Sequence, residues 1–250
     1  MERAAIVTGG GTGIGRATAI ALHRDGFGVV IAGRRPEPLE GTQALIGDDC
    51  VVFPGDIREP QVSAGLVEEC MSRFGQIDCL VNNAGGQFTA AAEDISPGGW
   101  RAVRRLNLDA PWFLTQAVAK RWMIGNGGRV ISVVLCPERG IAGMAHSSAA
   151  RAGMGALTRT LAMEWGRHGI ALNCVAPGWI DTEGVRGYDL DLDEVAAQVP
   201  MKRLGSAAEV GDLIAYLASP AAGYITGQTI AIDGGVDLTS SGWEPPQPGG

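Results

Sequence analysis

Residues 4–15 read Ala4-Ala5-Ile6-Val7-Thr8-Gly9-Gly10-Gly11-Thr12-Gly13-Ile14-Gly15, a short apolar run that passes directly into a glycine-rich turn. The apolar run is typical of a buried strand, and the segment that follows Gly15 has the pattern of a helix. Glycines in such a turn let the backbone approach a pyrophosphate, whose charge is met by the helix N-terminus. Any strand-to-helix turn can use glycine, so the rest of the chain must decide the fold.

Short apolar runs recur along the whole chain, separated by segments long enough for crossover helices. The predicted strands are Ala4–Thr8, Gly28–Ala32, Val51–Pro54, Ile77–Val81, Arg129–Val134, Ile170–Val175 and Thr229–Ile232. Strands that are apolar along their length and are each followed by a helix form a parallel sheet covered on both faces. The sequence therefore predicts an α/β fold: a single-domain, Rossmann-type, doubly wound parallel sheet of about seven strands with helices on both faces.

Composition narrows the classes of protein and partner. The chain has 250 residues and a formal net charge of −7, with no long run of like charge. We therefore expect a small-molecule substrate, and neither a nucleic-acid nor a membrane partner. The strand-like run at the N-terminus and the absence of a long apolar stretch lead us to expect a soluble, cytoplasmic protein.

Five cysteines, scattered and without Cys-x-x-Cys spacing, predict neither a disulfide framework nor a metal site. They are Cys50, Cys70, Cys79, Cys136 and Cys174. An odd number of isolated cysteines is typical of reduced thiols.

Two segments interrupt the alternation of strand and helix. Residues 179–205, rich in Gly and Asp, are predicted to be an irregular substrate lid before the final helix. Residues 240–250 carry Pro245-Pro246-Gln247-Pro248 and are predicted to be an extended tail. The dinucleotide-binding domain is accordingly expected to span residues 1–239.

The end of the second predicted strand indicates which dinucleotide is bound. Gly33 stands where an acidic residue would hold the 2′-hydroxyl of NAD, and Arg34 and Arg35 follow it. Because a guanidinium can grip a phosphate with its planar fork, NADP is preferred over NAD, and Arg34 is the better candidate for the contact. The alternative is a solvated surface pair of arginines.

A set of motifs in fixed order makes the chain resemble the short-chain dehydrogenase/reductase family over nearly its whole length. They are TGxxxGIG at Thr8–Gly15, Asp56-Ile57, Asn82-Asn83-Ala84-Gly85, Asn107, Pro177-Gly178-x-Ile180-x-Thr182 and Ile225-Thr226-Gly227-Gln228. The resemblance implies the same fold, an oxidoreductase activity and a nicotinamide dinucleotide cofactor.

The resemblance also implies a role for each matching residue. A nucleotide cradle is implied at Gly9, Thr12, Gly13, Ile14 and Gly15, adenine contacts at Asp56 and Ile57, ribose contacts at Asn83, Ala84 and Gly85, and contacts around the nicotinamide carboxamide at Pro177, Gly178, Ile180 and Thr182. Asn107 corresponds to the helix asparagine that holds a water in the family's proton relay. The alternative for Asn107 is a helix-interior polar side chain that bonds locally.

The catalytic positions depart from the family pattern. Where the family carries Tyr-x-x-x-Lys, this chain has Ser147 and Arg151, and the expected serine near the end of the fifth strand is also missing because that place reads Val133-Val134-Leu135. Ser132 lies too early on the strand to replace it. An unassisted serine is a poor acid and an arginine stays protonated, so the usual proton donor is absent.

A narrower resemblance accounts for the substitutions. Gly85-Gly86-Gln87-Phe88, Ile95-Ser96-x-x-Gly99-Trp100 and His146-Ser147-x-Ala149-Ala150-Arg151-Ala152-Gly153 are similar to the peroxisomal trans-2-enoyl-CoA reductases, which use NADPH and have Ser-x-x-x-Arg at these positions. The related 2,4-dienoyl-CoA reductases draw a tyrosine from the end of the fifth strand, where this chain has Cys136.

Reduction of an enoyl thioester needs hydride at Cβ, stabilisation of the enolate oxygen and a proton at Cα, which water can supply. The hypothesis is that Ser147 and a backbone donor hold the thioester oxygen, Arg151 fixes the nicotinamide ribose and supplies positive charge, and Asn107 orders the water. Cys136 and His146 are alternative acids.

Two other functions stay open at this point. One is a carbonyl reductase with an unconventional acid, and the other is a catalytically silent protein that binds NADP or a metabolite and serves as a regulator or as a subunit of an assembly. Small residues between Ala149 and Ala156 permit close helix packing, and with the resemblance they predict a homotetramer or homodimer. Alternatively, these alanines pack within one subunit.

Overall fold

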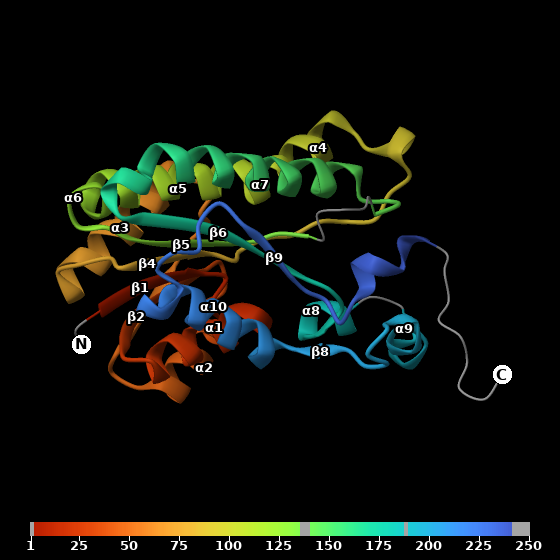
Figure 1. Cartoon of the computed structure of the whole chain (residues 1–250), viewed down its shortest axis with the longest axis horizontal. Coiled ribbons are helices and arrows are strands. Elements are labelled where there is room, and N and C mark those ends of the chain that lie inside the picture. The colour runs from red at the N-terminus through yellow and green to blue at the C-terminus, as the bar shows by residue number, and fades with distance from the viewer. Residues whose placement is uncertain (1–2, 136–140, 188–189, 242–250) are drawn as a thin grey trace.

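The computed structural model describes residues 3–135, 141–187 and 190–241 of the chain. Its main sheet is parallel throughout and has seven strands in the order β3-β2-β1-β4-β5-β6-β9 (Figure 1). The strands are β1 Arg3–Thr8, β2 Phe27–Gly33, β3 Cys50–Pro54, β4 Cys79–Asn82, β5 Gly128–Val133, β6 Ile170–Pro177 and β9 Thr229–Ile232. All seven predicted strands are present with slightly shifted ends, and the predicted fold class is confirmed.

Helices cover both faces of the sheet, as Figure 1 shows. One layer contains α1 Gly13–Arg24, α2 Pro36–Ile46 and α10 Ala207–Ala218, and the other contains α3 Pro60–Phe74, α4 Pro97–Arg104, α5 Ala110–Val118, α6 Ile124–Asn126 and α7 Ala145–Trp165. Shorter elements are the π-turns η2 Arg105–Asp109 and η3 Ala119–Met123 and the 3-10 turns η1 Ala92–Asp94, η4 Gly166–His168, η5 Pro220–Ala222 and η6 Val236–Ser241.

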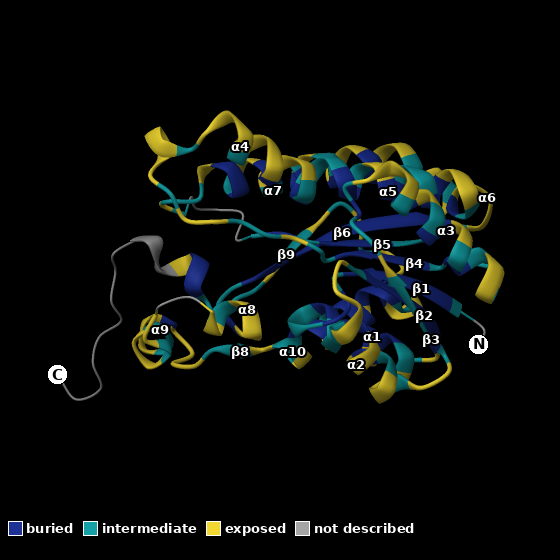
Figure 2. Cartoon of the chain, turned by 180° about the vertical axis from the view of Figure 1, so that it is seen from behind, coloured by how far each residue is buried: buried dark blue, intermediate teal, exposed yellow. Residues whose placement is uncertain are grey.

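The two layers follow from the apolar composition of the strands. In β1, Ala5 and Val7 pack against the side of α1, α2 and α10, whereas Ala4 and Ile6 pack against α3, α5 and α7, and all four are fully buried. Because successive side chains of a strand point to opposite faces, a strand without polar positions must be covered twice. Figure 2 shows the resulting buried sheet between helices whose outer faces are exposed.

The strand order places a crevice at the carboxyl end of the sheet. β1 pairs with β2 on one side and with β4 on the other, so the connections after β1 and β4 leave in opposite directions. In open parallel sheets such a switch point is where ligands bind. The glycine-rich turn after Thr8 and the Asn83 segment after β4 both open onto it.

The segment 179–205, predicted to be irregular, contains regular structure. It holds β7 Ile180–Asp181, paired in parallel with β8 Gly205–Ser206, and the helices α8 Glu183–Arg186 and α9 Leu192–Gln198. Helix ends here are closed by side chains, since Thr182 accepts from the Val185 N–H and Asp191 accepts from the N–H groups of Asp193 and Glu194. The Gly and Asp content therefore reflects turns and helix caps.

The predicted tail begins inside a structured element, because η6 extends to Ser241; the rest of the tail lies outside the described residues. In the described part of the chain, no helix is both long and apolar enough to span a bilayer. Among the same residues, no group of His, Cys, Asp or Glu side chains is arranged to hold a metal ion.

Candidate active site

The glycine-rich turn is held in a conformation that suits glycine alone. Gly9 and Gly13 have φ angles of +68° and +50°. A Cβ on Gly15 would lie 2.1 Å from the Gly9 carbonyl oxygen, so α1 can start this close to β1 only without a side chain. The turn thus presents bare backbone and the N-terminus of α1 to the crevice, which is the arrangement that suits a pyrophosphate.

The ends of β1 and β4 are tied together by polar groups. The Thr8 hydroxyl accepts hydrogen bonds from the N–H groups of Asn83 and Ala84, both at 3.0 Å, and donates to the Val81 carbonyl. The Asn83 amide in turn donates to the Thr8 carbonyl at 2.9 Å. These bonds fix the glycine-rich turn relative to the segment that follows β4.

A cavity of about 510 Å³ runs along this edge of the sheet. Its lining includes the glycine-rich turn, the end of β2, Asp56 and Ile57, and the Asn83–Gly85 segment. Pro177, Gly178 and Ile180 line a second cavity beside it, of about 730 Å³, and Thr182 lines both. Every residue that the sequence analysis places at the cofactor therefore lines one of the two cavities, and the glycine cradle fits a dinucleotide.

The end of β2 supplies positive charge to the first cavity. Arg34 and Arg35 are exposed and line it together with Asp56. The side-chain hydrogen bond from Arg58, whose Nε lies 2.9 Å from the Asp56 Oδ1, holds the pKa of the Asp56 carboxyl below its ordinary value. Asp56 is thus paired with Arg58, and Arg34 and Arg35 add further cationic groups to this end of the cavity.

The second cavity is strongly apolar. Its walls include Ile141, Met144, Trp179, Leu190 and Val236, and Arg151 is the only charged residue among its described lining residues. Side chains shared by the two cavities are Ile14, Gln87, Val133, Arg151, Thr182 and Val185. Gln87, Arg151 and Thr182 are therefore the polar side chains at the junction between a dinucleotide site and an apolar pocket.

Arg151 projects from α7 toward the carboxyl end of β5. Its Nη1 donates to the Val133 carbonyl at 2.9 Å. Its Nη2 lies so close to the backbone of Gly85 that a Cβ there would approach it within 2.5 Å. The guanidinium is thus fixed between β5 and the segment after β4, at the junction of the cavities.

Asn107 lies in the π-turn η2 and is buried. Its amide donates to the carbonyls of Gly86 and Val103, each at 2.8 Å, and its Oδ1 accepts from the Gly86 N–H. The hydrogen bond to Val103 is the local bond expected if Asn107 were only a polar side chain inside a helix. The two hydrogen bonds to Gly86, in contrast, hold the backbone immediately before Gln87. Both amide hydrogens are used, so Oδ1 is the atom of this side chain that could accept from a water.

Ser147 and His146 lie behind the cavity walls. Ser147 is fully buried, lines neither cavity, and its hydroxyl has no hydrogen-bond partner among the described residues. His146 is buried as well; its Nδ1 accepts from the Ser147 N–H at 2.9 Å, and its ring packs edge-on against Phe88. The role predicted for the Ser147 hydroxyl receives no support from this placement and stays a prediction.

None of the tyrosines and cysteines among the described residues lines either cavity. Cys136 lies outside the described residues, as does Tyr188. Tyr216 and Tyr224 are exposed, on α10 and just after η5, and line neither cavity. The described cysteines are buried, and burial raises the pKa of the Cys50, Cys70 and Cys79 thiols to about 12.

Three residues of the site are not predicted as site residues by the sequence. Gln87, which the sequence indicates only as part of a motif, lines both cavities two residues after the Asn83–Gly85 segment, and that position could have identified it. Arg16 braces the glycine-rich turn by donating to the Gly11 carbonyl at 2.7 Å. Glu183 accepts from the Gly13 N–H across a separation of 170 positions, and no local pattern indicates that contact.

Comparison with known proteins places these features in context. Residues 9–237 match the family model described as Enoyl-(Acyl carrier protein) reductase. A probable 2,4-dienoyl-CoA reductase [(2E)-enoyl-CoA-producing] of Bacillus subtilis is 37% identical over 244 residues, which cover 94% of this chain and 96% of the relative.

Solved structures agree with this match. The crystal structure of a short chain dehydrogenase from Bacillus anthracis superimposes with a TM-score of 0.88 at 36% identity and covers 96% of this chain and 98% of that one. A variant of actinorhodin polyketide ketoreductase, crystallised with NADPH, gives a TM-score of 0.90 at 28% identity and covers 94% and 97% of the two chains.

Proposed function

The chain belongs to the short-chain dehydrogenase/reductase family of oxidoreductases, and we propose that it uses NADPH to reduce an activated carbon–carbon double bond, in an enoyl thioester. The observation that carries the proposal is the junction of the two cavities. There a dinucleotide cradle meets an apolar pocket of about 730 Å³ across a wall whose polar side chains are Gln87, Arg151 and Thr182. Such a pocket suits an apolar acyl chain with one polar group at the reacting end.

NADP(H) would be held by the cradle and by the arginines after β2. The pyrophosphate would meet the backbone of Gly13 and Ile14, and the 2′-phosphate would meet Arg34. When bound, the reduced nicotinamide supplies a hydride. Preference for NADP over NAD is supported by the absence of an acidic residue at Gly33 and by the pairing of Asp56 with Arg58, which leaves a net positive end of the cavity.

The chain's own residues would stabilise the charge that develops on the substrate. Hydride addition at Cβ moves an electron pair onto the thioester oxygen, which becomes an enolate. The Gln87 amide can donate to that oxygen, and the Arg151 guanidinium, fixed on the Val133 carbonyl, adds positive charge nearby. A proton from water then completes Cα, so the missing phenol of the family is not required.

Asn107 acts in this proposal as a positioning residue. Its hydrogen bonds to the carbonyl and the N–H of Gly86 fix the backbone before Gln87, and so set the direction in which the Gln87 side chain projects. The predicted ordering of a water by Asn107 is kept, through Oδ1. Ser147 remains a predicted contributor, although its burial favours a structural role over direct contact.

The thioester is favoured over a ketone by chemistry and by similarity. A ketone needs a proton on the oxygen itself, and none of the described tyrosines or cysteines lines the junction. The Bacillus subtilis relative is described as a probable 2,4-dienoyl-CoA reductase. The acidic exposed residues Asp191, Asp193 and Glu194 on the lid segment would face away from the phosphates of coenzyme A in this proposal.

We also propose that the protein acts in the cytoplasm as a homotetramer or homodimer. Phe113 on α5 and Met163 on α7 are 56% and 79% exposed, and an apolar outer face on the helix layer is suited to packing against a second copy. Sedimentation of the purified protein as a monomer would contradict this assembly.

The function is tested by offering NADPH with a panel of enoyl-CoA thioesters and ketones and following NADPH consumption. The proposal predicts turnover of the enoyl thioesters. Turnover of ketones alone would favour the carbonyl reductase, and NADPH binding without any turnover would favour the catalytically silent protein.

Cofactor choice is tested separately with Arg34→Ala. The variant should lose about ten- to a hundredfold in affinity for NADPH while its affinity for NADH changes little, because only NADPH has the 2′-phosphate. Equal losses for both cofactors, measured by fluorescence titration, would contradict the assignment of Arg34.

A further inference from the structure

The Glu183 carboxylate lies at the N-terminus of α1. Its Oε2 accepts a hydrogen bond from the Gly13 N–H at 3.2 Å, and its Oε1 lies 3.5 Å from Nη1 of Arg16. Glu183 is the first residue of α8, so these contacts join the segment 179–205 to the glycine-rich turn across the cavity that both line.

The Gly13 N–H is one of the donors that an anion at this helix end would use. The first N–H groups of a helix have no partner within the helix, and the preceding Thr12 makes no side-chain cap. A carboxylate is the favoured side chain at such an end because it also meets the positive end of the helix dipole. Glu183 therefore satisfies the helix terminus in the way that a phosphate would.

The carboxylate and a pyrophosphate are incompatible at this donor. Both are anions, and two anions beside one N–H repel each other at a separation of a few ångströms. The guanidinium of Arg16, 3.5 Å from the Glu183 Oε1, also donates to the Gly11 carbonyl. Since the Glu183 side chain is 57% exposed, it can turn into solvent without leaving a buried charge.

We propose that Glu183 is an internal competitor of the cofactor pyrophosphate: it occupies the Gly13 N–H and is displaced when NADP(H) binds. This inference rests on the proposed use of NADP(H). Displacement frees α8 from the glycine-rich turn, and because Thr182 and Val185 line both cavities, cofactor binding is thereby linked to the wall of the substrate pocket. Glu183 is in this sense a positioning residue whose charge lowers cofactor affinity.

The test is the affinity of Glu183→Gln for ligands with and without a pyrophosphate. Glutamine keeps an oxygen that can accept from the Gly13 N–H but removes the negative charge. NADPH and ADP-ribose should bind to Glu183→Gln about three- to tenfold more tightly than to the original protein. Adenosine 2′-monophosphate, which has no pyrophosphate and would use the Arg34 end, should bind equally to both.

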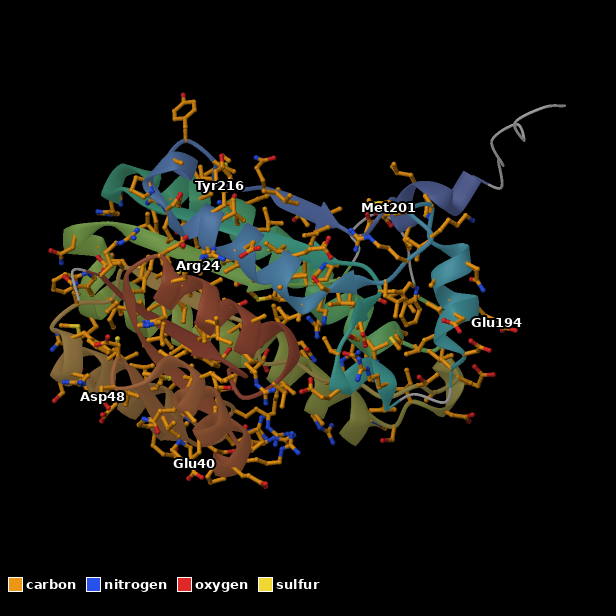
Figure 3. The ribbon with its side chains drawn as sticks, turned by 90° about the horizontal axis from the view of Figure 1, so that it is seen from below. Arg24, Glu40, Asp48, Glu194, Met201 and Tyr216 are labelled. Atoms are coloured by element: carbon orange, nitrogen blue, oxygen red, sulfur yellow. The ribbon has the colours of Figure 1, made fainter. Side chains whose placement is uncertain are left out.

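Two further measurements separate competition from a general charge effect. Glu194→Gln, the same change on α9, where Figure 3 shows the side chain directed outward, should leave all three affinities unchanged. The gain for Glu183→Gln should shrink when the salt concentration rises from about 0.05 M to about 0.5 M, since screening weakens repulsion between exposed charges. Glu183→Ala, which removes the oxygen as well, should also bind NADPH more tightly.

Unchanged or weaker NADPH binding by both Glu183 variants would overturn the inference, and weaker binding would assign Glu183 to holding α8 in the cofactor complex. If the original protein binds adenosine 2′-monophosphate, ADP-ribose and NADPH with no measurable affinity, the proposed function fails first and the inference fails with it.

Discussion

The region after β1 and β4 and the region around the start of α7 are built by different means. After β1 and β4, glycines, backbone groups and the Thr8–Asn83 hydrogen bonds form a fully connected cradle. At the start of α7, the buried hydroxyl of Ser147 and Nε2 of His146 have no partner among the described residues. In the proposed function, the first region holds the cofactor by backbone geometry, whereas the second depends on a few side chains that come from separate segments.

This difference has a functional consequence. A cradle made of backbone tolerates few side chains, because an added Cβ on Gly9 or Gly15 would meet neighbouring atoms at 2.8 Å or less. The junction of the two cavities instead presents side chains, among them Gln87 and Arg151. In the proposed function, the reaction at this junction is one in which a side-chain acid is not essential.

The largest effect is expected from breaking the cradle with Gly15→Ala. The new Cβ would meet the Gly9 carbonyl oxygen at 2.1 Å, so α1 and the turn must move apart. NADPH affinity should fall by roughly a hundredfold or more, and the free energy of unfolding should drop by about 1–3 kcal/mol. Gly41→Ala in α2, where a Cβ meets nothing within 4 Å, is the matched control and should leave NADPH affinity unchanged. If Gly15→Ala bound NADPH as tightly as the original protein does, the packing argument would be wrong.

Arg151→Ala should remove most of the turnover from the other region. Loss of the guanidinium held on Val133 should lower kcat/KM by about a hundredfold, because the developing enolate loses its nearby positive charge. Arg151→Lys should recover part of the rate. The assignment is untenable if steady-state kinetics of Arg151→Ala match those of the original enzyme.

Gln87→Leu should sharpen the comparison with a smaller effect. Leucine has similar bulk but cannot donate to the thioester oxygen, so kcat should fall by about ten- to thirtyfold while NADPH affinity stays within about twofold. Gln87→Asn, which keeps the amide, should retain more activity. If Gln87→Leu and the original enzyme had equal rates, Gln87 would not be the donor to the thioester oxygen, and another group would have to hold that oxygen.

The smallest effect concerns Asp56 in the cradle region. Hydrogen bonding by Arg58 holds the pKa of Asp56 below its ordinary value of 3.8, so the pair stabilises the folded state fully above about pH 4 and loses that contribution as the pH falls through the lower, folded-state pKa. Thermal melting should show Asp56→Asn about 1–3 °C less stable than the original protein at pH 7, with the gap closing in acid. Asp48→Asn on the surface is the control; a gap independent of pH would exclude the pairing.

The sequence was informative where structure depends on local pattern. Apolar runs such as Ala4–Thr8 and Ile170–Val175 identified the strands, because a strand covered on both faces must be apolar throughout. The glycines of the cradle were equally readable, since Gly9 and Gly15 are required by backbone geometry.

Contacts between distant segments could not be predicted in this way. The burial of Ser147 depends on how α7 packs, and the bond from Gly13 to Glu183 depends on where the segment 179–205 folds back. That segment was also expected to be irregular, because its Gly and Asp content indicates turns without revealing the short helices that Thr182 and Asp191 cap.

In the proposed function, the junction of the two cavities reduces an enoyl thioester, with water as the proton source. The most direct measurement is turnover of an enoyl-CoA by NADPH deuterated at the transferred position, with the product analysed by NMR. The account predicts deuterium at Cβ and, when the same reaction with unlabelled NADPH is run in deuterium oxide, deuterium at Cα. A protein that binds NADPH but forms no saturated product from any enoyl thioester would contradict the account.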